Sequence, residues 1–272
     1  MPTNERFVNS KHIIYYRHHY GNTRIASMIC IHGVLSEASL FNNLSILSNY
    51  GIDIYAITLP GYGASKDDLA SINFDDVLYS LHDMIKNIDA PKIILGFSLG
   101  TIYTLYYILK YKDVNKLILA SPLFHPINSR LPEYATRLYT LYNEGVKEIN
   151  LLEYLDIPRS RYEYIKNNDL CRKVYPTSYI ADMFLKAVNK NILNDIELPV
   201  LTLYGINDTF TTNEQVIEFY RLLKSNDKEL CVFNTDHWLF DTFSYDKPAN
   251  TQIIEHIKNF IIKQYNVFLD YP

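Results

Sequence analysis

The sequence is short of cysteine and of net charge, and each shortage excludes a class of protein. Its 272 residues include three cysteines, and the formal net charge is −4. An odd number of cysteines without a CxxC pair indicates neither a disulfide framework nor a four-cysteine zinc site. A small negative charge lacks the clustered basic excess that nucleic-acid binding requires. We therefore expect a protein of a reducing compartment that does not bind nucleic acid.

Long hydrophobic runs and the common cofactor motifs are also missing. Nowhere do about 18 apolar residues run together, and residues 1–30 lack the apolar core of a signal peptide. The sequence contains no HExxH, GxGxxG or P-loop pattern. We therefore expect a cytoplasmic protein with no stable membrane anchor, no metal and no other cofactor.

The sequence does contain an alternation of short apolar runs and longer amphipathic segments. Hydrophobic residues make up 48% of the chain, which allows a substantial core. Runs rich in β-branched and aromatic residues predict strands at 25–32, 52–59, 92–97, 115–121, 199–204 and 229–233, after an antiparallel strand at 12–17. Stripes of helical period predict helices over 71–89, 212–224 and 250–264. This order predicts an α/β fold with a mainly parallel central sheet flanked by helices.

One stretch interrupts this alternation. Residues 122–194 contain no convincing buried strand, whereas Tyr, Leu, Arg and Glu recur at helical spacings between prolines. A structureless loop of this length is uncommon inside a compact domain. We therefore predict a helical cap subdomain at 122–194, inserted into a core formed by 1–121 and 195–272.

The few glycines gather where the predicted strands end. Six of the nine lie at or just past strand carboxyl ends, where ligands bind in open parallel sheets. The stretch PKIILGFSLGT places Ser98 between Gly96 and Gly100, after a strand and before a predicted helix. In this context GxSxG is typical of a nucleophilic serine on a strained turn, where side chains two residues away would clash. We predict that Ser98 is a catalytic nucleophile.

A serine nucleophile needs a base, and the base needs an acid that orients it. His237 follows the strand at 229–233 and therefore lies at the same sheet edge as Ser98. Asp208 lies four residues beyond the strand at 199–204 and is the preferred acid, with Asp236 as its competitor. The other histidines fit less well: His12, His18 and His19 precede the core sheet, His82 and His256 lie in predicted helices, His125 enters the insertion, and His32 is expected to brace a loop.

Together these motifs resemble the α/β-hydrolase superfamily, and within it the lid-bearing esterases and the monoacylglycerol-lipase or lysophospholipase-like members. The resemblance spans nearly the whole chain. It rests on HG at 32–33, LPGYGAS at 59–65, GFSLG at 96–100, YGINDT at 204–209 and DHW at 236–238. These motifs follow the superfamily's order of nucleophile, acid and base.

The resemblance implies further site residues. The backbone N–H groups of Val34 and Leu99 would form an oxyanion hole, whereas Gly61 and Gly63 would have structural roles. The insertion at 122–194 stands where the family has its helical lid. Its apolar residues would cover an acyl pocket: Leu131, Tyr134, Leu138, Leu141, Tyr142, Leu151, Leu152, Tyr154, Met183 and Phe184.

The leading hypothesis is a serine hydrolase that cleaves carboxylic esters through an acyl-enzyme on Ser98. Its expected substrates are short or medium acyl esters, monoacylglycerols or lysophospholipid-like esters. A second hypothesis keeps the triad but changes the reaction, as in thioesterases, amidases, C–C hydrolases and cofactor-free haloperoxidases. A third is a non-enzymatic ligand-binding member of the fold.

Overall fold

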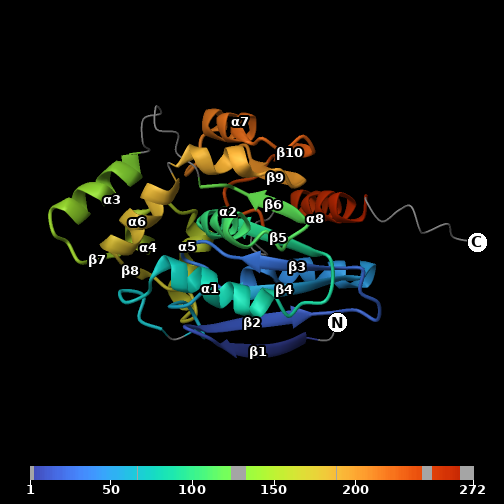
Figure 1. The fold of residues 1–272 in the computed structure, drawn as a ribbon. Helices are drawn as coiled ribbons and strands as arrows, with labels where there is room; N and C mark the ends of the chain where they lie inside the picture. The colour runs from blue at the N-terminus through green and yellow to red at the C-terminus, as the bar shows by residue number, and fades with distance from the viewer. Residues whose placement is uncertain (1–2, 66, 124–132, 188, 241–246, 264–272) are drawn as a thin grey trace, which may run out of the picture.

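An eight-stranded sheet organises the part of the chain that the structure, a computed structural model, describes: residues 3–65, 67–123, 133–187, 189–240 and 247–263. The strand order is β1-β2-β4-β3-β5-β6-β9-β10 (Figure 1). The strands are β1 (Thr3–Asn9), β2 (Ile13–His19), β3 (Ala26–Ile31), β4 (Ile52–Thr58), β5 (Lys92–Phe97), β6 (Lys116–Ala120), β9 (Val200–Gly205) and β10 (Lys228–Phe233). β2 pairs antiparallel with β1 and β4, and the remaining neighbours pair parallel.

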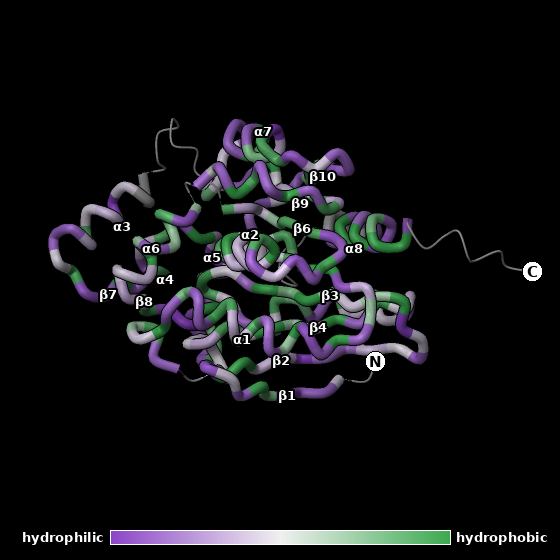
Figure 2. The backbone as a smooth tube through the Cα atoms, viewed as in Figure 1, coloured by the Kyte–Doolittle hydropathy of each residue, from purple (hydrophilic) through white to green (hydrophobic). Residues whose placement is uncertain are grey.

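The middle strands are apolar because both of their faces are covered. All residues of β3, β4, β6 and β9 are buried, and so are those of β5 after Lys92. Figure 2 shows this as hydrophobic colour along the centre of the sheet. All seven strands expected from the sequence are present. The structure adds β1, an edge strand that is mostly exposed and so carries no apolar signature.

Helices cover both faces of the sheet. Right-handed crossovers put α1 (Phe74–Ile85), α2 (Gly100–Tyr111) and α7 (Asn213–Leu222) on one face, and the 3₁₀ helix η1 (Ala38–Tyr50) on the other. α8 (Lys247–Ile262) contacts η1 and therefore lies on that second face. Thr212 and Gln215 form a capping box at the start of α7, the helix expected over 212–224. The expected α/β fold with a mainly parallel sheet is therefore confirmed.

The segment between β6 and β9 leaves the sheet and lies to one side of it (Figure 1). It contains α3 (Glu133–Asn143), α4 (Leu151–Tyr154), α5 (Arg159–Asn167), α6 (Thr177–Ala187) and the 3₁₀ helix η2 (Lys190–Asp195). Two short strands, β7 (Glu148–Asn150) and β8 (Val174–Pro176), pair antiparallel within it. This stretch, residues 121–199, is called the β6–β9 segment below.

Among the residues that the structure describes, no helix has both the length and the apolar character needed to cross a membrane.

Candidate active site

Ser98 occupies the tight turn between β5 and α2. Its φ angle is +52°, a left-handed value that residues with a side chain rarely adopt. β5 ends one residue before Ser98, and α2 begins at Gly100. The serine is 7% exposed. Because it lies beside the N-terminus of α2, the helix dipole favours negative charge at this position.

Glycines surround Ser98 because neighbouring backbones touch there. A Cβ on Gly96 would lie 2.5 Å from Thr104 Oγ1, and a Cβ on Gly100 would lie 2.2 Å from the carbonyl oxygen of Ile31. A Cβ on Gly33 would lie 2.8 Å from Cβ of Ser98. The close packing of β3, β5 and α2 therefore fixes the serine turn and brings the loop after β3 into contact with it.

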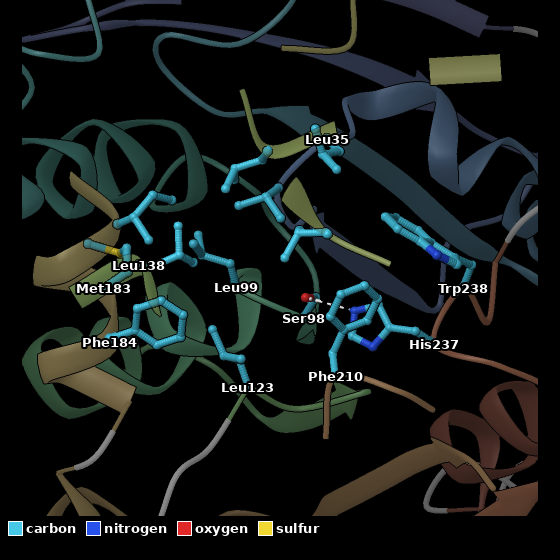
Figure 3. A pocket seen from close by; sticks show the side chains of 14 residues that line it. Leu35, Ser98, Leu99, Leu123, Leu138, Met183, Phe184, Phe210, His237 and Trp238 are labelled. Carbon is cyan, nitrogen blue, oxygen red and sulfur yellow. Dashed lines mark hydrogen bonds between the residues drawn. The ribbon is translucent and has the colours of Figure 1, made fainter. Parts of the chain in front are cut away.

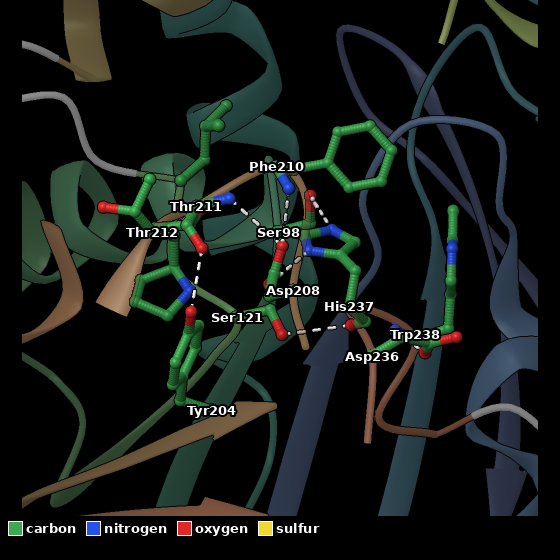
Figure 4. A network of polar contacts seen from close by, with 12 residues as sticks. Ser98, Ser121, Tyr204, Asp208, Phe210, Thr211, Thr212, Asp236, His237 and Trp238 are labelled. Carbon is green, nitrogen blue, oxygen red and sulfur yellow. Dashed lines mark hydrogen bonds and ion pairs between the residues drawn. The ribbon is translucent and has the colours of Figure 1, made fainter. Parts of the chain in front are cut away.

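His237 lies in the loop after β10, with its ring against Ser98 (Figure 4). The distance from His237 Nε2 to Ser98 Oγ is 2.9 Å. His237 is 4% exposed, and its carbonyl oxygen accepts a hydrogen bond of 3.0 Å from Ser121 Oγ. This bond ties the histidine loop to the end of β6, so the backbone that carries the imidazole is held at the sheet edge.

Asp208 lies on the opposite side of the imidazole. Its Oδ2 is 2.7 Å from His237 Nδ1, and its Oδ1 accepts hydrogen bonds from the backbone N–H groups of Phe210 and Thr211 at 2.8 and 3.0 Å. Burial raises the pKa of the carboxyl group, but attraction to His237 and these hydrogen bonds outweigh burial, so the pKa lies below its usual value. An ionised carboxylate can only accept, so Nδ1 carries the proton and Nε2 accepts from Ser98.

The competing acid, Asp236, has a different role. Its Oδ1 accepts a hydrogen bond of 2.9 Å from the backbone N–H of Trp238. The chain at Asp236 lies directly on Gly205 at the end of β9, where a Cβ would be 2.2 Å from the Asp236 carbonyl oxygen. The structure thus brings Ser98, His237 and Asp208 together and leaves Asp236 outside this chain of hydrogen bonds.

His32 is fully buried and braces the loops at the ends of β3 and β4, as expected. Burial lowers its pKa to about 4, so the ring is neutral near pH 7. Nδ1 donates to the carbonyl oxygen of Gly33 at 2.7 Å, and Nε2 accepts from the N–H of Leu59 at 3.0 Å. Both nitrogens are occupied, which leaves neither available as a base.

The loop after β3 carries the two residues that follow Gly33. Val34 lines the same pocket as Ser98 and Leu99, and Leu35 has a left-handed φ of +56°. The Leu35 N–H donates a hydrogen bond of 2.7 Å to the hydroxyl of Tyr175, which is fully buried and belongs to β8. The β6–β9 segment therefore holds the backbone beside Val34 in place.

Sequence reasoning missed Tyr175 and a second contact of the β6–β9 segment. The guanidinium of Arg161, on α5, lies 4.5 Å from the ring centroid of Trp238, the residue next to His237. Neither Tyr175 nor Arg161 belongs to a motif, and Tyr175 is one of 24 tyrosines in the chain. Because only three-dimensional packing brings these residues to the site, no local pattern could have identified them.

An apolar pocket opens at Ser98 (Figure 3). Its lining residues from the sheet-end loops and α2 include Val34, Leu35, Leu99, Phe210 and Trp238. The β6–β9 segment supplies Leu123, Leu138, Leu151, Leu155, Ile180, Met183 and Phe184. No charged side chain occurs among the described residues that line the pocket, and its polar side chains are those of Ser98 and His237, with the indole N–H of Trp238.

The expected cap residues reach this pocket only in part. Leu138, Leu151, Met183 and Phe184 line it, whereas Leu141, Tyr142, Leu152 and Tyr154 do not. Leu131 and the side chain of Tyr134 lie outside the residues that the structure describes. Leu123, Leu155 and Ile180 line the pocket without having been expected.

Within the described ranges, no group of three or more His, Cys, Asp or Glu residues is arranged to hold a metal ion.

Solved structures with the same architecture confirm the α/β-hydrolase fold. A soluble variant of monoglyceride lipase from Saccharomyces cerevisiae superposes with a TM-score of 0.81 at 17% identity, covering 97% of this chain and 95% of its own. A carboxyl esterase from Bacillus coagulans superposes with a TM-score of 0.76 at 16% identity, covering 97% and 99%. Both identities are low, so these likenesses establish the fold alone.

The sequence comparisons agree with the fold. A pimeloyl-[acyl-carrier protein] methyl ester esterase from Neisseria meningitidis is 22% identical over 216 residues, which are 74% of this chain and 82% of that protein. The model of the family described as serine aminopeptidase, S33, matches residues 22–237, a range that includes Ser98, Asp208 and His237. The superfamily resemblance inferred from the motifs is thereby confirmed, and the chain belongs to the serine aminopeptidase S33 family.

Proposed function

We propose that the protein is a serine hydrolase that cleaves carboxylic esters through an acyl-enzyme on Ser98. The observation that carries this proposal is the pair of hydrogen bonds that links Ser98 Oγ to His237 Nε2 at 2.9 Å and His237 Nδ1 to Asp208 Oδ2 at 2.7 Å. These three groups meet at an apolar pocket. The arrangement matches the roles of nucleophile, base and orienting acid.

The first half of the reaction acylates the serine. Ser98 Oγ bonds to the ester carbonyl carbon while its proton passes to His237 Nε2. The negative charge on the carbonyl oxygen is stabilised by the backbone N–H groups of Val34 and Leu99, a contribution of about 3 kcal/mol for one such donor. The C–O bond to the alcohol then breaks, and the imidazolium returns the proton to the leaving oxygen.

The second half releases the acid. A water molecule gives a proton to His237 Nε2 and attacks the acyl carbon, and the proton then passes to Ser98 Oγ as the acyl bond breaks. Asp208 accepts a hydrogen bond from Nδ1 throughout, which keeps the imidazole in the required tautomer and stabilises its charged form. Its lowered pKa keeps the carboxylate ionised in this role.

The pocket favours an aliphatic acyl group over an amino-acyl group. Recognition of the free amino terminus of a peptide calls for a carboxylate, because a buried ammonium group needs a charged partner. No Asp or Glu occurs among the described lining residues. Small esters with an apolar acyl chain are therefore the proposed substrates, including those of monoacylglycerol type.

We propose that residues 122–194 act as the helical cap over this pocket, with 1–121 and 195–272 as the core. In support, α3, α4 and α6 of the β6–β9 segment each supply lining residues. The three cysteines, Cys30, Cys171 and Cys231, are not joined in disulfides, which supports a reducing compartment such as the cytoplasm.

The function is tested by labelling and turnover together. A fluorophosphonate probe should label the wild-type chain once, on Ser98, and Ser98→Ala should neither be labelled nor hydrolyse p-nitrophenyl butyrate. Turnover of a butyryl thioester and of butyryl anilide, compared with that of the butyryl ester, distinguishes an esterase from a thioesterase and from an amidase. Tight binding of a fatty acid without labelling of Ser98 or turnover of any ester would contradict the proposed activity and favour a ligand-binding role.

A further inference from the structure

Helix α6 separates the active-site pocket from a second hollow on the molecular surface. Ile180, Met183 and Phe184 line the pocket at Ser98. Tyr179, Met183 and Lys186 line a groove between α6 and the region around the start of α1. Met183 is the one described residue that lines both spaces.

Helix geometry explains why Met183 holds this position. Residues three or four apart share a face of a helix, so 180, 183 and 184 form one stripe and 179, 182, 183 and 186 form another. Met183 belongs to both stripes. Figure 3 shows it at one end of the pocket with Leu138 and Phe184, whereas Trp238 lies at the other end and Ser98 between them. Met183 is 2% exposed, so it lies buried between the pocket and the groove, both of which it lines.

The groove beyond Met183 is lined by both apolar and polar side chains. Leu69, Ile72 and Phe74 contribute apolar side chains to it. Lys186 pairs with Asp182 at 2.5 Å and lies 4.6 Å from the ring centroid of Phe74, so its charge has a partner beside the groove. A hydrocarbon chain that reached this groove would meet these apolar side chains beside polar ones, which include Asp75 and Asp182.

We propose that Met183 is the end wall of the acyl pocket and sets the longest acyl chain that binds fully. Each methylene group added to the acyl chain is buried until the chain end reaches the thioether of Met183. Methylene groups beyond that length cannot pass Met183 into the groove. This inference rests on the proposed esterase function and names the residue that determines its chain-length specificity.

The test is a series of p-nitrophenyl esters from acetate to palmitate, with kcat/KM plotted against acyl length. The wild-type value should rise and then reach a break point. Met183→Ala removes the three side-chain atoms beyond Cβ, so the break point should move to acyl chains about three carbons longer. Each newly buried methylene should raise kcat/KM about fourfold. Met183→Phe fills the same space with a bulkier ring and should move the break point to shorter chains.

The matched control is Leu185→Ala, on the same helix. Leu185 is 57% exposed and lines neither space, so its substitution should leave the break point unchanged. Should Met183→Ala fail to fold, Met183→Phe alone decides. The proposal is overturned if the break point of the folded Met183 variants equals that of the wild type or moves in the opposite direction.

The outcomes also separate this inference from the proposed function. A wild-type chain that neither reacts with a fluorophosphonate nor hydrolyses any ester contradicts the esterase itself. A wild-type chain that is labelled on Ser98 and hydrolyses the series, with a break point that does not depend on residue 183, contradicts only the role of Met183.

Discussion

The loops at the sheet edge and the β6–β9 segment contribute to one pocket, but the sequence constrains them differently. Gly100 in the first region and Gly145 in the second illustrate this. A Cβ on Gly100 would lie 2.2 Å from the carbonyl oxygen of Ile31, whereas a Cβ on Gly145 would meet no atom within 4 Å. Gly145 is instead favoured by its φ of +81°. Backbone contact constrains one region, and local conformation the other.

This difference predicts how each region responds to substitution. At the sheet edge, the proposed catalytic groups lie on turns that packed backbones hold, so a single added methyl group should lower stability markedly. In the β6–β9 segment, side chains reach the site from helices and a short strand. Substitutions there should cause smaller changes, either in the rate or in the acyl chain length that the pocket accepts.

The largest effect is expected for Asp208→Asn, at the sheet edge. An amide at this position no longer enforces the Nδ1–H tautomer of His237, so kcat should fall by about 10⁴-fold. The control is Asp236→Asn, because an amide oxygen can still accept the hydrogen bond from the N–H of Trp238. Steady-state kinetics of the two variants should differ by orders of magnitude, and equal losses would contradict the assignment of the acid.

The two glycines give the next largest effect. Gly100→Ala should lower the free energy of unfolding by about 3 kcal/mol because the new Cβ overlaps backbone. Gly145→Ala should lower it by only about 1 kcal/mol, the cost of a left-handed alanine in open space. Urea unfolding of both variants measures the difference. Equal destabilisation by Gly145→Ala and Gly100→Ala would contradict the claim that backbone contact constrains only the sheet-edge glycine.

Tyr175→Phe should have a smaller effect, and mainly on rate. It leaves the N–H of Leu35 without its acceptor, a loss of about 1–2 kcal/mol that should loosen the backbone beside Val34. We expect kcat to fall about tenfold with KM nearly unchanged.

Tyr179→Phe is the matched control for Tyr175→Phe. The hydroxyl of Tyr179 bonds to those of Tyr62 and Tyr103 at 3.3 and 3.2 Å, and not to the loop after β3. This variant should lose stability while keeping kcat. Equal losses of kcat in both variants would contradict a specific effect of the bond between Tyr175 of β8 and the loop after β3.

The smallest effect is the pH dependence of stability that Asp208 contributes. Its pKa is lower in the folded chain than its ordinary value of about 3.9. Its contribution is therefore complete above that value, from about pH 5, and is lost as pH falls through the folded pKa. The unfolding free energy of the wild-type chain should exceed that of Asp208→Asn by less and less as the pH falls from about 5 to about 3. If the difference in unfolding free energy between the two proteins did not change with pH, the lowered pKa of Asp208 in the folded chain would be contradicted.

The same contrast explains how much could be predicted from the sequence. The five middle strands were predictable because their faces are buried and their residues mostly apolar, whereas the exposed β1 was not. Ser98, Asp208 and His237 could be placed together because each follows a parallel strand, and the carboxyl ends of these strands share one edge. Tyr175 and the position of Met183 between two spaces depend on how the β6–β9 segment packs. No motif or single period encodes that packing.

The most direct test of the account is acid-quenched mass spectrometry after mixing the enzyme with p-nitrophenyl butyrate. The account predicts a burst of about one equivalent of p-nitrophenol and one butyryl group on the peptide that contains Ser98. Ser98→Ala should show neither. Ester hydrolysis without an acyl group on Ser98, or a butyryl adduct that persists in Ser98→Ala, would contradict it.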